Sequence, residues 1–223
     1  MQTRLAAIIT LLFIGSISRA DEKDGWMELF NGKDFTGWVI DGPKDYKDKA
    51  DGNKVKPLWT VEEGLIRTTG NGFGFLRYDK KFDNFVFHVE YRMVKEKDVN
   101  SGLGIRTMIF DPKKSLETRP SMYSYEVQLL DDTGAKPNEH GTGSLYRYVA
   151  PAKTAHKPAP EWNTVEVECV GPKIRISFNG TETLNFDQST NPKLKDKPLS
   201  GYVCLQTHSK QVEFKNVRLK VLK

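Results

Sequence analysis

The stretch Tyr125-Glu126-Val127-Gln128-Leu129-Leu130-Asp131 alternates between apolar and polar side chains. Tyr125, Val127 and Leu129 share one parity, whereas Glu126 and Gln128 share the other. Because successive side chains of a strand point to opposite faces, this pattern predicts a half-buried β-strand. Glutamate is uncommon in strands, so its position here indicates either a solvated outer face or the lining of a polar cleft.

The same alternation recurs along the chain and predicts an all-β protein. Its longest segment runs from Asn84 to Met93, and Asn179-Gly180 between two further segments is a strong β-hairpin signal. Short strand signals separated by turns, with almost no helix signal, favour a two-sheet antiparallel jelly-roll sandwich. No internal repeat is visible, which argues against a propeller.

Two local features modify this pattern. The apolar parity of the last segment changes after Phe214, which predicts a β-bulge near Lys215-Asn216. Residues Asp41 to Lys56 are rich in Lys, Asp and Gly, and we expect them to form a mobile surface loop.

The N-terminus has the pattern of a secretory signal peptide. Arg4 precedes an apolar run from Leu5 to Ile17, and Ser18-Arg19-Ala20 places small residues before the expected cleavage point. The run is too short to span a bilayer. We therefore predict a signal peptide over residues 1–20, a single exported domain over residues 21–223, a periplasmic or extracellular location, and no membrane span.

Charge and cysteine content narrow the function classes. Removing Arg4 and Arg19 with the signal peptide leaves 34 − 2 = 32 basic residues against 29 acidic ones, so the net charge of the mature chain is weak. No basic cluster with interleaved aromatic residues occurs, so we expect no nucleic-acid binding. Cys169 and Cys204 could form a disulfide after export or remain two buried thiols, and their spacing is not that of a structural zinc site.

Strand parity also yields candidates for a polar cleft. The outward-facing candidates are Glu90, Arg106, Glu126, Gln128, Gln206 and His208. Amides, carboxylates, arginine and histidine on one face would suit a sugar site, because they hydrogen-bond to hydroxyl groups and hold one another in place. Tyr146, in the long segment from Asp132 to Pro160, is expected to form a wall of this cleft. Exposed aromatic residues such as Trp38 and Trp162 could stack on sugar rings. For Trp162, however, we prefer the interpretation that it packs in the core.

Several motifs occur in an order that resembles a known family. They are Glu28-Leu-Phe-Asn-Gly-Lys-Asp-Phe-Thr-Gly-Trp38, Asn100-Ser-Gly-Leu-Gly-Ile-Arg106, Tyr125 to Asp131, Leu145-Tyr146, Glu161-Trp-Asn-Thr164, Asn179-Gly180 and Leu205-Gln-Thr-His208. Together, from about Trp26 to Leu222, they resemble the 3-keto-disaccharide hydrolase domain family. The resemblance implies a concanavalin-A-like lectin/glucanase jelly roll and cleavage of glycosides that carry a ketone at carbon 3. The Lys-rich insertion between Trp38 and Trp59 departs from this pattern and is expected to alter the rim of the site.

The same fold also hosts ordinary retaining glucanases, whose motif reads Glu-x-Asp-x-x-Glu. Here the corresponding stretch is Glu126-Val-Gln128-Leu-Leu-Asp131, so the central Asp is replaced by Gln and the last carboxylate is shorter. Retaining hydrolysis needs two carboxyl groups about 5 Å apart. The sequence therefore disfavours direct double displacement.

A 3-keto-sugar needs only a base and a stabiliser for the enolate, because the ketone acidifies the C2 proton. We expect His208 to be the base, with Glu126 second, since Arg106 would pair with Glu126 and lower its pKa. Arg106 would stabilise the enolate, although a divalent metal could replace it. Gln128, Glu90, Asp131, Tyr146 and Gln206 complete the predicted substrate contacts.

The second hypothesis is a non-catalytic, lectin-like carbohydrate-binding module, because lectins and hydrolases of this fold use similar clefts. A purely structural or partner-binding role is the third hypothesis. The first two name a carbohydrate as the partner, and none of the three predicts an oligomeric state.

Overall fold

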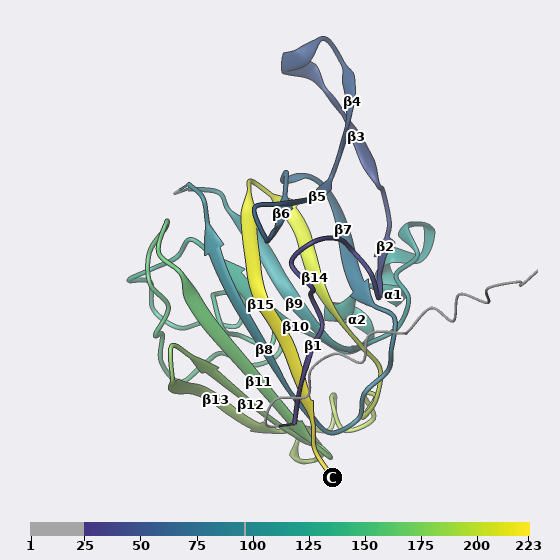
Figure 1. Ribbon diagram of the computed structural model, residues 1–223. Helices are drawn as coiled ribbons and strands as arrows, with labels where there is room; N and C mark the ends of the chain where they lie inside the picture. The colour runs from purple at the N-terminus through teal and green to yellow at the C-terminus, as the bar shows by residue number, and fades with distance from the viewer. Residues whose placement is uncertain (1–24, 96) are drawn as a thin grey trace, which may run out of the picture.

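The computed structural model describes residues 25–95 and 97–223, so the predicted signal peptide lies outside the described residues and stays a prediction. Two antiparallel sheets pack face to face (Figure 1). The larger sheet has the order β13 (Thr181–Asp187), β12 (Lys173–Phe178), β11 (Asn163–Val170), β8 (Phe85–Met93), β15 (Val212–Val221), β6 (Leu65–Thr68) and β5 (Trp59–Glu62), with β1 (Trp26–Glu28) beside β15. The smaller sheet has the order β10 (Tyr125–Leu130), β9 (Asn100–Thr107), β14 (Tyr202–Ser209), β7 (Asn71–Tyr78) and β2 (Trp38–Asp41). The predicted all-β antiparallel jelly-roll sandwich is confirmed.

Helices play a small part in the fold. The helices α1 (Ser115–Thr118) and α2 (Pro120–Tyr123) lie between β9 and β10, and single 3₁₀ turns occur at Lys49–Asp51, Pro112–Lys114 and Gln188–Thr190. No helix in the described part of the chain is both long and apolar enough to cross a membrane.

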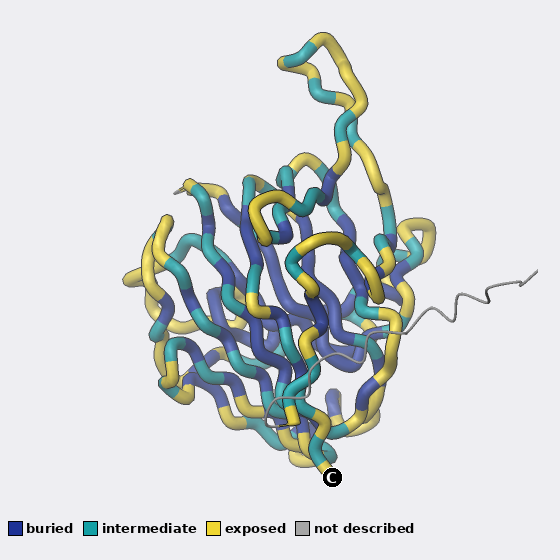
Figure 2. Tube along the Cα trace, viewed as in Figure 1, coloured by how far each residue is buried: buried dark blue, intermediate teal, exposed yellow. Residues whose placement is uncertain are grey.

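The core lies between the two sheets and follows from the alternation of side chains. In β8, Phe85, Phe87 and Val89 are fully buried, and they share one hydrophobic cluster with Val127 of β10 and Leu205 of β14. Burying each such side chain stabilises the fold by about 1.5–3 kcal/mol. Figure 2 shows the buried residues following the strands, with exposed residues gathered at the turns and at the projecting hairpin tip.

Two turn signals predicted from the sequence are confirmed. The hairpin between β12 and β13 has φ angles of 49° at Asn179 and 77° at Gly180, which match the twist of the flanking strands. The predicted bulge in the last strand is also present, because the pairing of β15 with β8 shifts between Lys215 and Arg218 and Asn216 has a φ of 48°.

The insertion between Trp38 and Trp59 is not the irregular loop expected from its composition. Asp41 ends β2, and the segment then folds into an antiparallel hairpin, β3 (Asp45–Asp48) and β4 (Lys54–Pro57), which projects from the sandwich (Figure 1). Lys56 lies 2.8 Å from Asp48 and 3.0 Å from Asp51, so ion pairs across the hairpin help to hold its shape.

Both cysteines are free and buried, so of the two alternatives the structure has buried thiols rather than a disulfide. Cys169 belongs to the main core between the sheets, whereas Cys204 packs with Phe75 and Phe110 in a separate cluster. Trp38 is also a core residue, since only 7 % of it is exposed and its indole N–H donates to the carbonyl of Leu29, so it is not available to stack on a sugar.

Candidate functional site

The face of the smaller sheet that points away from the core carries a small polar pocket, which we call the Glu126 pocket. From the strands it is lined by Phe73, Asn100, Glu126, Gln128, Gln206 and His208. From the flanking loops it is lined by Arg119, Ser121, Tyr146 and Arg147. Its volume is about 60 Å³. Segments far apart in the sequence therefore meet at one point.

Glycines on the neighbouring strand make room for the polar side chains. In the pairing of β10 with β9, Glu126 lies opposite Gly104 and Gln128 lies opposite Gly102. A Cβ atom at Gly102 would come within 2.9 Å of the Glu126 Oε1 atom. The carboxyl group thus occupies space that any other residue at position 102 would take.

Glu126 is the most unusual group in the pocket. It is 5 % exposed, and the Nε2 atom of Gln206 donates to its Oε1 atom at 2.8 Å. Burial raises its pKa to about 7, because desolvation of the carboxylate outweighs the hydrogen bonds from Gln206 and Ser121 and the more distant charges of Arg119 and Arg147. A carboxyl group with this pKa can both accept and release a proton near neutral pH.

Two arginines border the pocket without being neutralised by a carboxylate. The half-buried Arg119 donates to the carbonyl and the hydroxyl of Ser115, and its guanidinium lies over the ring of Phe73. The exposed Arg147 lies over the ring of Tyr146. Neither has an ion pair with an acid among the described residues, so both positive charges face the pocket uncompensated.

His208 stands at the rim of the pocket. Its ring makes an edge-to-face contact with Phe73, with centroids 5.4 Å apart. Partial burial lowers its pKa, and the nearby charge of Arg119 lowers it further. His208 is therefore a mainly neutral imidazole at neutral pH.

Two amide side chains of the pocket have carbonyl oxygens that accept no hydrogen bond from the described residues. The Oε1 atoms of Gln128 and Gln206 are buried and have no hydrogen-bond partner among the described residues. The Nε2 atom of Gln206 is used by Glu126, and that of Gln128 reaches Asn100 at 3.4 Å. A buried acceptor without a partner is unfavourable, so these oxygens are suited to bind ligand hydroxyl groups.

The wall of the pocket is the segment that follows β10. The backbone N–H of Tyr146 donates to the carbonyl of Glu126 at 2.9 Å, so this segment covers the free edge of β10. Further along, Asp132 accepts a hydrogen bond from the backbone N–H of Thr142 and lies 3.2 Å from the Nε2 atom of His156. Burial pushes the pKa of Asp132 up, but these partners outweigh it and lower the pKa to about 2. The wall is thus held by hydrogen bonds to β10 and by the contacts of Asp132 with Thr142 and His156.

The rest of this sheet face is apolar. Phe75, Phe110 and Cys204 form a small cluster there, and Pro120 of α2 lies against the backbone of β9 at Gly104. Beside the cluster, Arg77 pairs with Asp41 at 2.8 Å. Among the described residues, the Glu126 pocket thus lies beside a small apolar cluster and a buried ion pair.

Five of the predicted site residues line this one pocket. They are Glu126, Gln128, Tyr146, Gln206 and His208. Their chemical roles stay predictions.

The predicted position of Arg106 is wrong. Arg106 has a φ of 53°, which breaks the alternation of β9 and turns the side chain toward the interior, where it is fully buried. Its guanidinium donates to the carbonyls of Asp83 and Gly171. It therefore does not pair with Glu126, and the predicted lowering of the Glu126 pKa is replaced by a rise.

Glu90 and Asp131 are also misplaced. Glu90 is on β8 of the larger sheet, where it accepts from Asn216 at 2.7 Å and lies 3.5 Å from Lys215. The alternation of residues predicted that the Glu90 side chain points away from the core, but it could not predict which of the two sheets contains its strand. Asp131 lies beyond the end of β10 and lines a separate depression with Thr133 and Pro158.

The sequence analysis missed the residues of the pocket that come from irregular segments. Arg119 lies between two short helices, Ser121 lies in the one-turn helix α2, and Arg147 lies in a turn, so no periodic pattern pointed to them. The one available signal was the position of Arg147 beside the predicted wall residue Tyr146. Among the described residues, no three His, Cys, Asp or Glu side chains converge in a way that could hold a metal ion.

Comparison with known proteins gives consistent results. Residues 25–220 match the family described as 3-keto-α-glucoside-1,2-lyase-like domains. A relative named 3-keto-disaccharide hydrolase, from Bacteroides thetaiotaomicron, is 26 % identical over 90 % of this chain and 80 % of its own length. A solved structure from Parabacteroides distasonis, provisionally assigned as a glycosyl hydrolase, is 26 % identical over 90 % of this chain and 95 % of its own, with a TM-score of 0.70. The exoplasmic/lumenal domain of VIP36, solved in a form bound to Ca²⁺ and Man3GlcNAc, shares the fold, with a TM-score of 0.54, 9 % identity and 90 % coverage of each chain.

Proposed function

The chain belongs to the family of 3-keto-α-glucoside-1,2-lyase-like domains, and from this premise we propose that it cleaves the glycosidic bond of 3-keto-glucosides by removing the proton at C2. The family and its named relative support a glycosidase. The requirement for a ketone at C3 and the proton-transfer mechanism are the proposal.

The observation that carries the proposal is Glu126. A carboxyl group at the bottom of a pocket, with a pKa of about 7 and only neutral hydrogen-bond donors in contact, is suited to general-base catalysis near neutral pH. The sequence analysis placed His208 first as the base because it expected an arginine to pair with Glu126. Since Arg106 lies elsewhere, that order is reversed here.

In the first step, Glu126 removes the C2 proton of the sugar. The C–H bond breaks, its electron pair moves toward the C3 ketone, and an enolate forms. The enolate then expels the group at C1 with the C1–O electron pair, which leaves a double bond between C1 and C2. A single carboxylate is sufficient for this elimination, so the missing second carboxylate of retaining glucanases is no obstacle.

The two uncompensated arginines are suited to the negative charge that develops. Arg119 and Arg147 both border the pocket, and both carry a positive charge throughout the pH range of interest. A fixed positive charge near the enolate oxygen stabilises the transition state more than the ground state, in which that oxygen is neutral. They take the role that the sequence analysis gave to Arg106.

His208 has a separate role at the rim. Expulsion of the aglycone requires one proton on the departing oxygen, and addition of water at C1 releases one. The departing oxygen takes its proton from water at the exposed rim. His208, as a neutral imidazole, accepts the proton that water releases when it adds to C1 and passes it to solvent, while protonated Glu126, whose proton exchanges with solvent, protonates C2. Elimination followed by this hydration gives the net hydrolysis of the glycoside.

The narrow pocket limits how the sugar can bind. A volume of about 60 Å³ is well below the roughly 300–1,000 Å³ typical of sites that enclose a small ligand. It admits one edge of a pyranose ring, and the C1–C2 edge is the one that must reach Glu126. The amide acceptors of Gln128 and Gln206 would then bind hydroxyl groups at that edge.

The test is to incubate the purified protein with 3-keto-maltose in D₂O and to analyse the product by NMR and mass spectrometry, with and without a chelator. We expect release of 3-keto-glucose carrying deuterium at C2, faster than in a control without protein. Cleavage without deuterium at C2 would overturn the mechanism. Binding of unchanged sugar would instead assign the lectin-like function, and loss of cleavage with the chelator would show that a metal takes part.

A further inference from the structure

A lysine outside the Glu126 pocket contacts three residues that adjoin lining residues in the sequence. The Nζ atom of Lys197 donates to the carbonyl of Met122 at 2.8 Å. It also lies 5.5 Å from the ring centroid of Tyr125 and 4.7 Å from that of Tyr148. The lining residues next to these three are, in the same order, Ser121, Glu126 and Arg147. One ammonium group therefore joins α2, β10 and the wall of the pocket.

The backbone of Lys197 holds this residue in place. Its N–H donates to the carbonyl of Leu194 at 3.0 Å, and its carbonyl accepts from the Nε2 atom of Gln188 at 2.8 Å. Leu194 and Gln188 are both buried, and the Oε1 atom of Gln188 lies 3.3 Å from the hydroxyl of Tyr125. The loop that carries Lys197 is thus attached to the core, and its ammonium group is a fixed point for the segments around it.

The surroundings of the Lys197 ammonium group are unfavourable for a charge. Among the described residues its contacts are a neutral carbonyl and two aromatic rings, and no carboxylate pairs with it. Burial accordingly lowers its pKa to about 8. Cation–π contacts and one hydrogen bond offset only part of the lost solvation. An apolar side chain of similar length would fill the same space without this loss, so packing alone does not account for a lysine here.

Met122 connects Lys197 to both arginines of the pocket. Its backbone N–H donates to the carbonyl of Arg119 at 2.9 Å, and its Sδ atom accepts from the Nη1 atom of Arg147 at 3.5 Å. A thioether is a weak acceptor and Arg147 is exposed, so this contact alone would not hold the guanidinium. Lys197 holds the Met122 carbonyl at one side of this contact and the ring of Tyr148, next to Arg147, at the other.

We propose that Lys197 is a positioning residue of the Glu126 pocket, which holds Arg119 and Arg147 within electrostatic reach of the Glu126 carboxyl group. The charges of these two arginines lower the pKa of Glu126 against the rise caused by burial, so their positions affect the protonation of the base as well as the stability of the enolate. The effect on catalysis rests on the function proposed above. The effect on Glu126 does not, because it is a property of the protein without substrate.

The first experiment measures the protonation of Glu126 in the free protein. The chain is labelled with ¹³C-glutamate, the Glu126 carboxyl signal is assigned by its loss in Glu126→Gln, and its titration is followed by NMR. We expect Lys197→Met to lower the acid dissociation constant of Glu126 about threefold, because the arginines are no longer held beside it. Lys195→Met, an exposed lysine on the same loop, should leave the constant unchanged.

An unchanged constant in a folded Lys197→Met protein would overturn the inference. Circular dichroism checks the folding of each variant, and Lys197→Gln takes the place of Lys197→Met if the latter does not fold.

A double-mutant cycle separates positioning from a direct effect of the Lys197 charge. The same titration is repeated with Lys197→Met in an Arg147→Met background. If Lys197 acts through the arginines, its removal should change the Glu126 constant less in this background than in the wild type, because one of them is already absent. Equal changes in both backgrounds would overturn the inference, since they would show that Lys197 acts on Glu126 independently of Arg147.

The last experiment compares kcat and KM for 3-keto-maltose. We expect Lys197→Met to lower kcat about tenfold with KM unchanged, because the arginines stabilise charge that develops only in the transition state. Lys195→Met should change neither constant. A rise in KM with kcat unchanged would overturn the catalytic part of the inference. If the wild type does not cleave 3-keto-maltose but the Glu126 constant responds as expected, the proposed function fails while the positioning role of Lys197 stands.

Discussion

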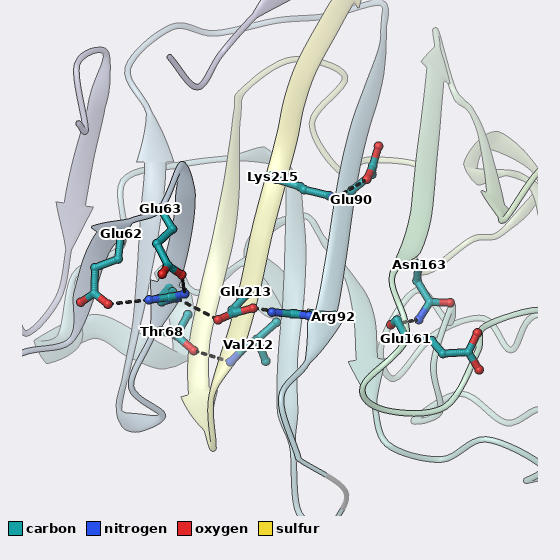
Figure 3. A network of polar contacts seen from close by, with 11 residues as sticks. Glu62, Glu63, Thr68, Glu90, Arg92, Glu161, Asn163, Val212, Glu213 and Lys215 are labelled. Carbon is teal, nitrogen blue, oxygen red and sulfur yellow. Dashed lines mark hydrogen bonds and ion pairs between the residues drawn. The ribbon is translucent and has the colours of Figure 1, made fainter. Parts of the chain in front are cut away.

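Two glutamates in this molecule are almost equally buried but have opposite surroundings. Glu213 is 3 % exposed and lies on the outer face of the larger sheet, where Arg67 contacts its Oε1 atom at 2.8 Å and Arg92 its Oε2 atom at 2.6 Å (Figure 3). Both arginines are its cross-strand neighbours. Glu126 is 5 % exposed on the outer face of the smaller sheet, and only neutral groups contact it.

The difference shows how the same side chain can serve structure or chemistry. A carboxylate between two guanidinium groups makes charge-assisted hydrogen bonds to both of them, and these bonds join three strands. A buried carboxyl group without such a partner changes its protonation near neutral pH, which destabilises its anionic form but makes it useful as a base. Burial alone therefore does not identify a carboxyl group that is suited to proton transfer. The charged or neutral groups that contact the carboxyl identify it.

The largest expected effect is that of Glu126→Gln on activity. Removal of the base should lower kcat for 3-keto-maltose by about 1,000-fold, because a positioned general base contributes about 10²–10⁴-fold. Glu90→Gln, the same change on the other sheet, is the matched control and should retain activity. A Glu126→Gln variant with more than half of the wild-type kcat would remove Glu126 from the mechanism.

The second effect is on the pH dependence of stability. The folded-state pKa of Glu126, about 7, lies above its ordinary value of 4.5, so the folded state binds more protons between these values. The free energy of unfolding should therefore fall by about 3 kcal/mol as pH rises from 4.5 to 7 and beyond, since each pKa unit corresponds to about 1.4 kcal/mol.

Urea titrations of the wild type and of Glu126→Gln at pH 4.5, 6 and 8 measure this effect. The difference between the two proteins isolates it from other titrating groups. If their stabilities run parallel across the whole range, Glu126 has the same pKa folded and unfolded and does not differ from an ordinary carboxylate.

Glu213→Gln should have the third largest effect, and on stability rather than on activity. The change leaves Arg67 and Arg92 without their shared anion, and we expect the free energy of unfolding to fall by about 2 kcal/mol, less than for a fully buried pair because both arginines are partly exposed. Urea unfolding at pH 7 measures it. The comparison breaks if Glu126→Gln, in the same assay, is destabilised as much as Glu213→Gln.

The smallest effect is expected for an exposed pair. Arg175 and Glu168 are 3.1 Å apart, but their side chains are 50 % and 36 % exposed. Glu168→Gln should change the free energy of unfolding by less than about 0.5 kcal/mol, because solvent and salt screen such pairs. A loss comparable to that of Glu213→Gln would show that burial does not decide the strength of these ion pairs.

The sequence predicted the parts of this protein that follow a period of two. The alternation of Tyr125 to Leu130 correctly placed Glu126 and Gln128 outside the core, and Asn179-Gly180 correctly marked a hairpin. Parity says nothing, however, about which of two sheets a strand joins, and this is why Glu90 was assigned to the wrong face.

The rest of the site depends on local departures from the period. A single residue with positive φ turned Arg106 inward, and no pattern in its neighbours announces this. Arg119 and Arg147 come from irregular segments, whose path is set by packing against the finished sheet. The pKa of Glu126 could not be derived either, since it depends first on how deeply the folded chain buries the carboxyl group and then on which polar groups approach it in space.

Gly102 has no functional group, yet the position of the Glu126 carboxyl depends on it. Alanine there would place its methyl group 2.9 Å from a carboxylate oxygen at the end of a flexible side chain, which can move aside more readily than the backbone. In evolutionary terms the two positions are coupled: the glutamate at position 126 keeps its present side-chain position only while position 102 is glycine. Selection for catalysis would then preserve a residue that contributes only empty space.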